Sequence, residues 1–157
     1  MRVHRLNRRS FLLGSFAAGA LACDKKGAEG ESSDEIGPLM APSLLATRLD
    51  EIKSGKVVVL YTGPEILFGR GHVPGARSVG EAGTKEGIAA IEAAISATPK
   101  ETEIVLYCGC CPIRSCPNIR PASAALRRLK RNNAFWLDLP TRFATDWTEK
   151  GYAVERS

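Results

Sequence analysis

The sequence predicts a single α/β domain built around a central, mostly parallel, five-stranded sheet flanked by helices. From about residue 39 onward, apolar runs typical of strands alternate with helical segments. The run at 57–61 is continuously apolar, which is typical of a strand covered on both faces, and 104–107 is a short apolar strand candidate. The chain has 157 residues, which leaves room for one domain once its N-terminal region is set aside.

The spacing of apolar residues defines the elements in order. Leu45, Leu49 and Ile52 recur at i, i+4 and i+7, which predicts a helix over 42–54 that Gly55 ends. The other predicted elements are a strand at 57–61, a helical turn at 65–68, a strand at 77–79, a helix at 85–97, a strand at 103–107, a helix at 118–131, a strand at 134–139 and a helix at 142–150.

Charge is unevenly distributed along the chain. The whole sequence has a net charge of +5, with 22 basic and 17 acidic residues. Residues 1–22 hold four arginines and no acid, so the rest of the chain has 18 basic and 17 acidic residues, a net charge of +1. The basicity therefore belongs to the N-terminal segment, and we expect no nucleic-acid partner.

Residues 1–22 have the layout of an export signal. The apolar run 11–22 follows the arginines and is shorter than the ~20 residues that a stable membrane span needs. Residues 8–12, Arg-Arg-Ser-Phe-Leu, resemble the twin-arginine motif of bacterial export. An ordinary secretion signal with paired arginines is the alternative.

Cys23 is the candidate lipidation site. Residues 20–23, Ala-Leu-Ala-Cys, resemble a lipobox, although Ala stands three places before the Cys where Leu is usual. Ordinary signal peptidase would cut the same bond and attach no lipid. Residues 23–38 are predicted to be a flexible tether, because 24–35 lack large apolar residues. We expect residues 39–157 to lie on the periplasmic side of a bacterial envelope, lipid-anchored to a membrane.

Four of the five cysteines lie within residues 108–116. Cys108 directly follows the strand at 103–107, and ligands of parallel sheets bind at the carboxyl ends of strands. Backbone N–H groups of the turn and of the next helix can stabilise a thiolate there. The alternative is a structural patch or a disulfide knot. Export to an oxidising compartment would allow a Cys110–Cys116 or Cys111–Cys116 disulfide, whereas a Cys110–Cys111 disulfide would be strained.

Three segments resemble the rhodanese family of sulfurtransferases. Residues 71–76, Gly-His-Val-Pro-Gly-Ala, resemble its G-H-[IV]-P-G-A loop, and the strand that ends in Cys108 resembles the approach to its active-site Cys. Residues 147–154 resemble its closing W-x-x-x-G-[YF]-P-V, with Ala153 in place of Pro. The order and spacing match over about residues 40–155. The resemblance implies that Cys108 carries sulfane sulfur as a persulfide, from a donor such as thiosulfate or a persulfide to a thiol acceptor, with no required cofactor.

The loop after Cys108 departs from the family pattern. Five residues separate Cys108 from Arg114, where the family has four between Cys and Arg. Similar longer loops occur in phosphatase and arsenate-reductase relatives, which accept larger oxyanions. The family's Asp-x-Arg after the first buried strand is also missing, because residues 61–63 are Tyr-Thr-Gly. The resemblance implies an anion-binding loop, with Arg114 or Arg120 as the clamp, that comprises Gly109, Cys110, Cys111, Ile113, Arg114 and Arg120.

The extra cysteines leave other functions open. Cys110, Cys111 and Cys116 suggest a relay of sulfur or electrons around Cys108, or a thiolate site for Cu(I) or Zn(II). The spacing lacks the two separated pairs of a zinc ribbon, so we assign no metal site. Residues 108–111 contain C-x-x-C, a possible redox pair, but Pro112 follows it and the helix begins well downstream. A phosphatase or arsenate reductase would need a general acid, and the sequence offers no candidate.

The remaining polar and aromatic residues receive structural interpretations. We expect His72 to fix its Gly/Pro loop and not to act as a base, because no acid in the sequence is placed to orient it. Arg70 and Arg77 flank that loop and are expected to be solvated, as is the basic end of the helix at 118–131, which comprises Arg127, Arg128, Lys130 and Arg131. The aromatic residues expected in the core are Tyr107, Phe135, Trp136 and Trp147.

Overall fold

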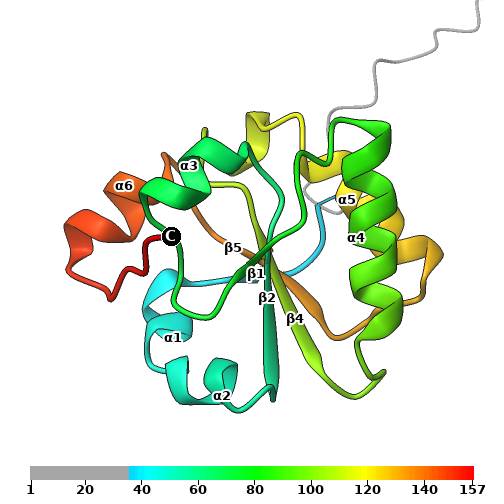
Figure 1. Cartoon of the computed structure of the whole chain (residues 1–157), viewed down its shortest axis with the longest axis horizontal. Coiled ribbons are helices and arrows are strands. Elements are labelled where there is room, and N and C mark those ends of the chain that lie inside the picture. Colours follow the sequence, from blue (N-terminus) through cyan, green and yellow to red (C-terminus); the bar gives the residue numbers. More distant parts are fainter. Residues whose placement is uncertain (1–35) are drawn as a thin grey trace, which may run out of the picture. The chain divides into compact units, whose positions relative to one another are not determined.

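A parallel five-stranded sheet forms the centre of the structure, a computed structural model that describes residues 36–157 (Figure 1). Every pair of neighbouring strands is parallel. The predicted α/β fold class is therefore confirmed. In spatial order the strands are β1 (Leu39–Met40), β5 (Ala134–Leu137), β4 (Glu103–Tyr107), β2 (Val57–Tyr61) and β3 (Arg77–Ser78).

Register places the ends of the two central strands side by side. Val57 of β2 pairs with Glu103 of β4, and Tyr61 pairs with Tyr107. The residues that follow the two strands therefore meet at one edge of the sheet. Figure 1 shows α3 (Glu65–Arg70) and the loop that follows β4 at this edge.

Helices cover both faces of the sheet. The helices α4 (Lys85–Ala97) and α5 (Ile119–Arg128) lie on one face, whereas α1 (Pro42–Ala46), α2 (Leu49–Lys53) and α6 (Phe143–Asp146) lie on the other (Figure 1). Side chains of β4 alternate between these layers, as the two-residue period of a strand requires. Ile104, Leu106 and Cys108 belong to the core under α4 and α5, while Val105 and Tyr107 belong to the other core. Among the expected core aromatics, Tyr107, Trp136 and Trp147 are buried, and Phe135 is partly buried.

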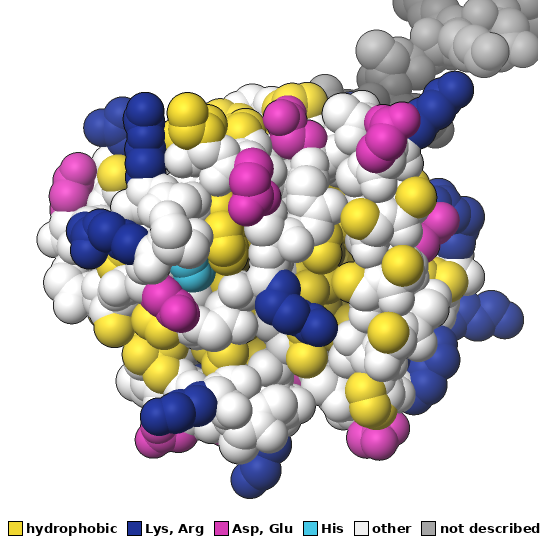
Figure 2. Space-filling model, in the orientation of Figure 1, with side chains coloured by type: hydrophobic (Ala, Val, Ile, Leu, Met, Phe, Trp, Pro, Cys, Tyr) yellow, Lys and Arg dark blue, Asp and Glu magenta, His cyan; other side chains and the backbone are white. Residues whose placement is uncertain are grey.

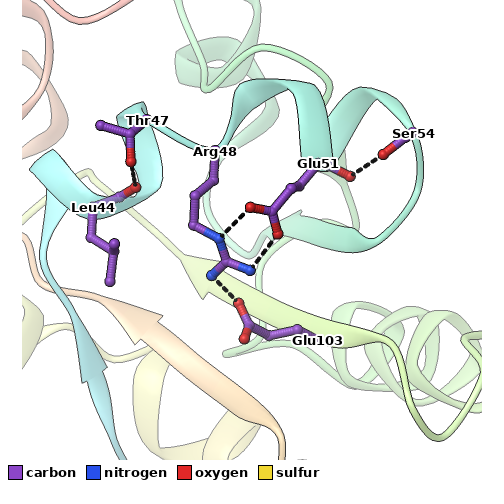
Figure 3. Close-up of polar contacts among 6 residues, drawn as sticks. All are labelled: Leu44, Thr47, Arg48, Glu51, Ser54 and Glu103. Atoms are coloured by element: carbon purple, nitrogen blue, oxygen red, sulfur yellow. Dashed lines mark hydrogen bonds and ion pairs between the residues drawn. The ribbon is translucent and has the colours of Figure 1, made fainter.

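The predicted helix over 42–54 is wrong as a single element, because it is divided into α1 and α2 near Arg48. The Thr47 hydroxyl donates a hydrogen bond to the Leu44 carbonyl at 2.8 Å, and so competes with continued helical bonding. The Arg48 side chain leaves the helix axis to bind Glu51 at 2.7 Å and Glu103 at 2.5 Å (Figure 3). This ion-pair network ties the α1–α2 junction to the start of β4.

Other boundaries differ by a few residues. The strand β5 ends at Leu137, and the predicted helix at 142–150 is α6 followed by a 3₁₀ turn, η3 (Thr148–Lys150). The two-residue β1 was missed as an element because it is too short to carry a periodic pattern. Ile36 and Pro38, placed in the tether by the sequence, contact the domain: Ser123 Oγ donates to Ile36 O, and Trp136 N–H donates to Pro38 O.

Arg131 corrects the prediction of a fully solvated basic cluster. Its side chain is buried, and its Nη2 group donates hydrogen bonds to the carbonyls of Pro99 at 3.0 Å and Thr102 at 3.4 Å. The neighbouring Arg128 is exposed and ion-paired with Glu92 of α4. Arg131 therefore anchors the end of α5 to the turn before β4.

Residues 1–35, which include the predicted signal, Cys23 and most of the tether, lie outside the described part of the chain. Within residues 36–157, none of the helices has the length and apolar character needed to cross a bilayer. On the face shown in Figure 2, acidic and basic side chains are interspersed and do not gather into a patch of one sign.

Candidate active site

Cys108 lies at the carboxyl end of β4, at the bottom of a cavity of about 470 Å³. The residue is only 2% exposed, so most of its surface is packed against the core. Tyr61, from the end of β2, and Phe143, from the start of α6, line the same cavity. The cavity therefore forms at the edge where parallel sheets bind ligands.

Gly63 makes room for the Cys108 sulfur. A Cβ atom at this position would lie 2.9 Å from Cys108 Sγ and 2.6 Å from Tyr61 Oη, which is closer than non-bonded atoms approach. The sequence analysis noted Gly63 only as part of the Tyr-Thr-Gly that stands where the family has Asp-x-Arg. Gly63 thus belongs to the site, at the position where the family's Asp-x-Arg motif is missing.

The structure brings the predicted cysteine cluster together. Cys108 Sγ lies 3.1 Å from Cys110 Sγ, and Cys110 Sγ lies 3.2 Å from Cys111 Sγ. The sulfur atoms of Cys108, Cys110 and Cys116 all lie within 4.8 Å of one another. The four described cysteines are free thiols, so the disulfides that the sequence left open are not formed in this structure.

Asn118 positions the Cys108 sulfur from the N-terminal end of α5. Its Nδ2 group donates to Cys108 Sγ at 3.4 Å, and its Oδ1 atom accepts a hydrogen bond from Gly83 N–H at 2.7 Å. The second bond fixes the orientation of the amide and aims its donor at the sulfur. The sequence prediction used Asn118 only as a helix start, although its polar side chain beside the cysteine loop was an available signal.

These contacts lower the pKa of the Cys108 thiol to about 6. The main cause is a hydrogen bond from the Cys116 thiol, which outweighs the opposing effect of burial. The Cys110 backbone N–H and the Asn118 amide also stabilise the thiolate. Burial raises the pKa of Cys110, and the bond to Cys108 together with burial raises the pKa of Cys116. The cluster therefore places its negative charge on Cys108.

The rate of Cys108 alkylation is expected to depend on pH with a midpoint near 6. Iodoacetamide reacts with thiolates, and a lowered pKa means that the thiolate is lost only when the pH falls through about 6. An ordinary cysteine would lose its thiolate near pH 8.5. Mass spectrometry of the Cys108 peptide, after alkylation of reduced, chelator-treated protein at a series of pH values, measures the midpoint.

Substitution of Cys116 provides the control for this titration. Cys116→Ala removes the main hydrogen-bond donor and is expected to raise the midpoint, whereas Cys116→Ser keeps a donor and should raise it less. A wild-type midpoint near that of an ordinary cysteine, with no change in Cys116→Ala, would contradict the proposed thiolate.

Three arginines line the cavity above Cys108: Arg70 of α3, Arg142 and Arg156. Arg70 was expected to be a solvated residue; its side chain is exposed and also borders the cavity. Arg114 and Arg120, the predicted clamp residues, are exposed and do not line this cavity, so their proposed role stays a prediction. Ile113 is buried at the base of the loop, where its N–H donates to Leu139 O at 3.1 Å.

His72 holds the C-terminal segment beside the cavity. His72 and Glu155 exchange two backbone hydrogen bonds of 2.9 and 3.0 Å, and the Glu155 carboxylate accepts a bond from Gly75 N–H at 2.8 Å. The His72 ring stacks on Phe68, and its Nδ1 atom lies 2.9 Å from Phe68 O. These contacts fit the predicted loop-fixing role, but the expectation that no acid lies beside His72 was wrong, because Glu155 Oε2 lies 3.8 Å from His72 Nε2. They also bring Arg156, the neighbour of Glu155, to the cavity wall.

Comparison with known proteins gives a fold assignment. No protein-family model matches the sequence, and no curated protein is similar to it. The rhodanese-like domain of an Anabaena protein matches 76% of this chain and 80% of its own chain, with a TM-score of 0.54 and 19% sequence identity. The domain has the rhodanese fold. The parallel sheet and the helices that flank it are thus parts of a rhodanese-like architecture.

Two further solved structures share this architecture. The BH2092 protein of Bacillus halodurans matches 78% of this chain and 79% of its own, with a TM-score of 0.57 and 18% identity. EanB, solved in complex with hercynine, matches over 76% of this chain and 28% of its own, with a TM-score of 0.51 and 21% identity. At these identities the similarity concerns the fold alone.

Proposed function

We propose that this protein is a sulfurtransferase that carries sulfane sulfur on Cys108 as a persulfide. The observation that supports this most is the position of one reactive thiol at the bottom of a cavity with three arginines on its walls. A thiolate is a nucleophile for sulfur, and guanidinium groups bind small oxyanions. The substrate class that fits both features is an anionic sulfane-sulfur donor such as thiosulfate.

The proposed first step is attack of the Cys108 thiolate on the outer sulfur of thiosulfate. A bond forms between Cys108 Sγ and that sulfur, the S–S bond of thiosulfate breaks, and sulfite leaves with the electron pair. Arg70, Arg142 and Arg156 offset the charge of the donor and of the sulfite. An acceptor thiolate then takes the outer sulfur from the persulfide, which restores the Cys108 thiolate. These steps require no cofactor.

A single-turnover experiment tests this proposal. Reduced protein mixed with thiosulfate is expected to release sulfite in an amount equal to the protein, whichever group takes the sulfur afterwards. If no sulfite appears, Cys108 does not accept sulfane sulfur from thiosulfate and the proposal fails.

The cysteine cluster supports a second candidate function, the binding of a thiophilic metal ion. The sulfur atoms of Cys108, Cys110 and Cys116 lie within 4.8 Å of one another, as ligands of Cu(I) or Zn(II) would. However, two thiolates on tetrahedral zinc lie about 3.8 Å apart, given Zn–S bonds of about 2.3 Å. The Cys108–Cys110 separation of 3.1 Å is shorter. Metal binding would therefore require these two sulfur atoms to move apart, which ranks this function second.

Metal analysis distinguishes the two functions. Reduced protein incubated with Zn(II) or Cu(I) and then desalted would retain one ion per chain if the cluster is a metal site. Retention would be lost in Cys116→Ser. Failure of the protein to retain metal, together with sulfite release from thiosulfate, leaves sulfur transfer as the function.

We also propose that the protein is exported and lipid-anchored at Cys23, on the basis of the signal-like residues 1–22 and the lipobox-like residues 20–23. Cys23→Ala is expected to move the protein from the membrane fraction to the soluble fraction of the envelope, because it removes the site of the proposed lipid anchor. Fractionation of bacterial cells with immunodetection measures this shift. If the variant stays with the membrane, Cys23 is not the anchor.

A further inference from the structure

The Cys108 and Cys110 side chains meet although one residue separates them. In a regular strand, side chains at i and i+2 lie about 6.6 Å apart, because each residue advances about 3.3 Å. Here the sulfur atoms are 3.1 Å apart. Gly109 has a φ of +73°, a left-handed conformation that turns the chain back directly after β4.

Gly109 is held in this turn by packing and by a hydrogen bond. Phe143 N–H donates to the Gly109 carbonyl at 3.0 Å. A Cβ on Gly109 would lie 2.8 Å from Phe143 Cβ, so only glycine fits against the start of α6. The close approach of the two thiols therefore rests on a fixed backbone turn as well as on side-chain rotation.

Cys110 is the thiol best placed to react with a group formed on Cys108. It is the cysteine that shares the arginine-lined cavity with Cys108. Cys116 lies within 4.8 Å of Cys108 but does not line that cavity. Cys111 contacts Cys110, at 3.2 Å. A leaving group released from Cys108 beside Cys110 has an open route through the cavity.

We infer that Cys110 is a resolving thiol that attacks the inner sulfur of the Cys108 persulfide and releases the sulfane sulfur as hydrosulfide. This inference rests on the proposed function. A bond forms between Cys110 Sγ and Cys108 Sγ, and the bond from Cys108 Sγ to the outer sulfur breaks. The outer sulfur of the persulfide first takes the Cys110 proton, so that the attacking group is a thiolate, and then leaves with the electron pair as hydrosulfide. The two cysteines are oxidised to a disulfide, the sulfane sulfur is reduced, and a dithiol reductant then restores both thiols.

The environment of Cys110 suits this proton transfer. Burial and the neighbouring cysteines raise its pKa, so that Cys110 keeps its proton while Cys108 reacts with the donor. The three arginines that bind the incoming anion also favour the outgoing hydrosulfide. The net reaction would convert thiosulfate and a dithiol into sulfite, sulfide and a disulfide. The sulfur would thus leave as sulfide, with electrons from the dithiol reductant and no separate sulfur-accepting protein.

Single-turnover stoichiometry tests the inference on the purified full chain. Fully reduced, desalted protein receives one equivalent of thiosulfate with no external thiol. About one equivalent of sulfite and about one of sulfide are expected, with a Cys108–Cys110 disulfide found by peptide mapping. Added dithiothreitol should then permit further turnovers.

Two variants locate the resolving thiol by the ratio of sulfide to sulfite. Cys110→Ser is expected to keep the sulfite burst, to lose at least about nine-tenths of the sulfide, and to retain one extra sulfur atom on Cys108. Ser115→Ala, at an exposed position of the same loop, is the matched control and should keep a ratio near that of wild type.

Each other outcome has a defined meaning. Sulfite without sulfide in the wild type, with a stable persulfide, overturns the inference and leaves the proposed function intact. An extra sulfur found on Cys110, or loss of sulfide in Cys116→Ala while Cys110→Ser keeps it, also overturns the assignment. Absence of sulfite means that the proposed function itself fails.

Discussion

Cys108→Ser is expected to abolish sulfur transfer from thiosulfate to cyanide, with a rate loss of at least about 10³-fold. A serine hydroxyl stays protonated at neutral pH, whereas the pKa of Cys108 is lowered to about 6 and the thiol is mostly ionised. Oxygen is also a poor nucleophile toward sulfur. The assay is the formation of thiocyanate, measured together with the sulfite burst at one equivalent of thiosulfate.

Two controls accompany this test: the thermal stability of Cys108→Ser and the activity of the Cys116→Ala variant. The substitution exchanges one small buried group for another, so the thermal unfolding midpoint should show that the domain still folds. Cys116→Ala keeps the nucleophile and removes the main donor to its thiolate, so it should reduce the rate at pH 7 by far less than Cys108→Ser. Full activity in Cys108→Ser would remove Cys108 as the sulfur acceptor.

The parts of the fold that depend on local pattern were predictable. The apolar runs at 57–61 and 104–107 could be assigned to strands from local pattern alone, and both lie in strands of the sheet. The two-residue β1 has no such pattern; it is a strand only because it hydrogen-bonds to β5. The break between α1 and α2 depends on Glu103, which lies far from Arg48 in sequence.

In the candidate site, too, some residues could be predicted from local sequence and others depend on contacts between distant parts of the chain. Cys108 could be placed because one strand delivers it and because the cysteines cluster in sequence. Asn118 and Gly63 act through contacts with Cys108 that only the folded chain makes. Arg156 reaches the cavity because Glu155, the residue that follows the 147–154 motif, pairs with His72 of the 71–76 motif. Motif matching found both segments but could not reveal that the chain beside one pairs with the other.

Removal of the arginines that line the cavity is expected to weaken the use of anionic donors. Arg142→Ala and Arg156→Ala should each lower kcat/KM for thiosulfate about tenfold, and the double variant about 10²-fold. Charge-assisted hydrogen bonds to an oxyanion are strong, but these side chains are solvent-exposed, which limits each contribution. Steady-state kinetics with thiosulfate measures the loss. Added salt should narrow the gap between wild type and variants, because it screens the same attraction.

Comparison with other arginines decides whether the cavity or the cysteine loop binds the donor. Arg77→Ala removes an exposed arginine of β3 that does not line the cavity, and it should leave kcat/KM near the wild-type value. Arg114→Ala tests the clamp predicted from the family pattern. A large loss in Arg114→Ala with none in Arg142→Ala or Arg156→Ala would mean that the loop closes over Cys108 on binding. The reverse result would show that Arg142, at the start of α6, and Arg156, in the C-terminal segment, form the anion site, and that the cysteine loop does not.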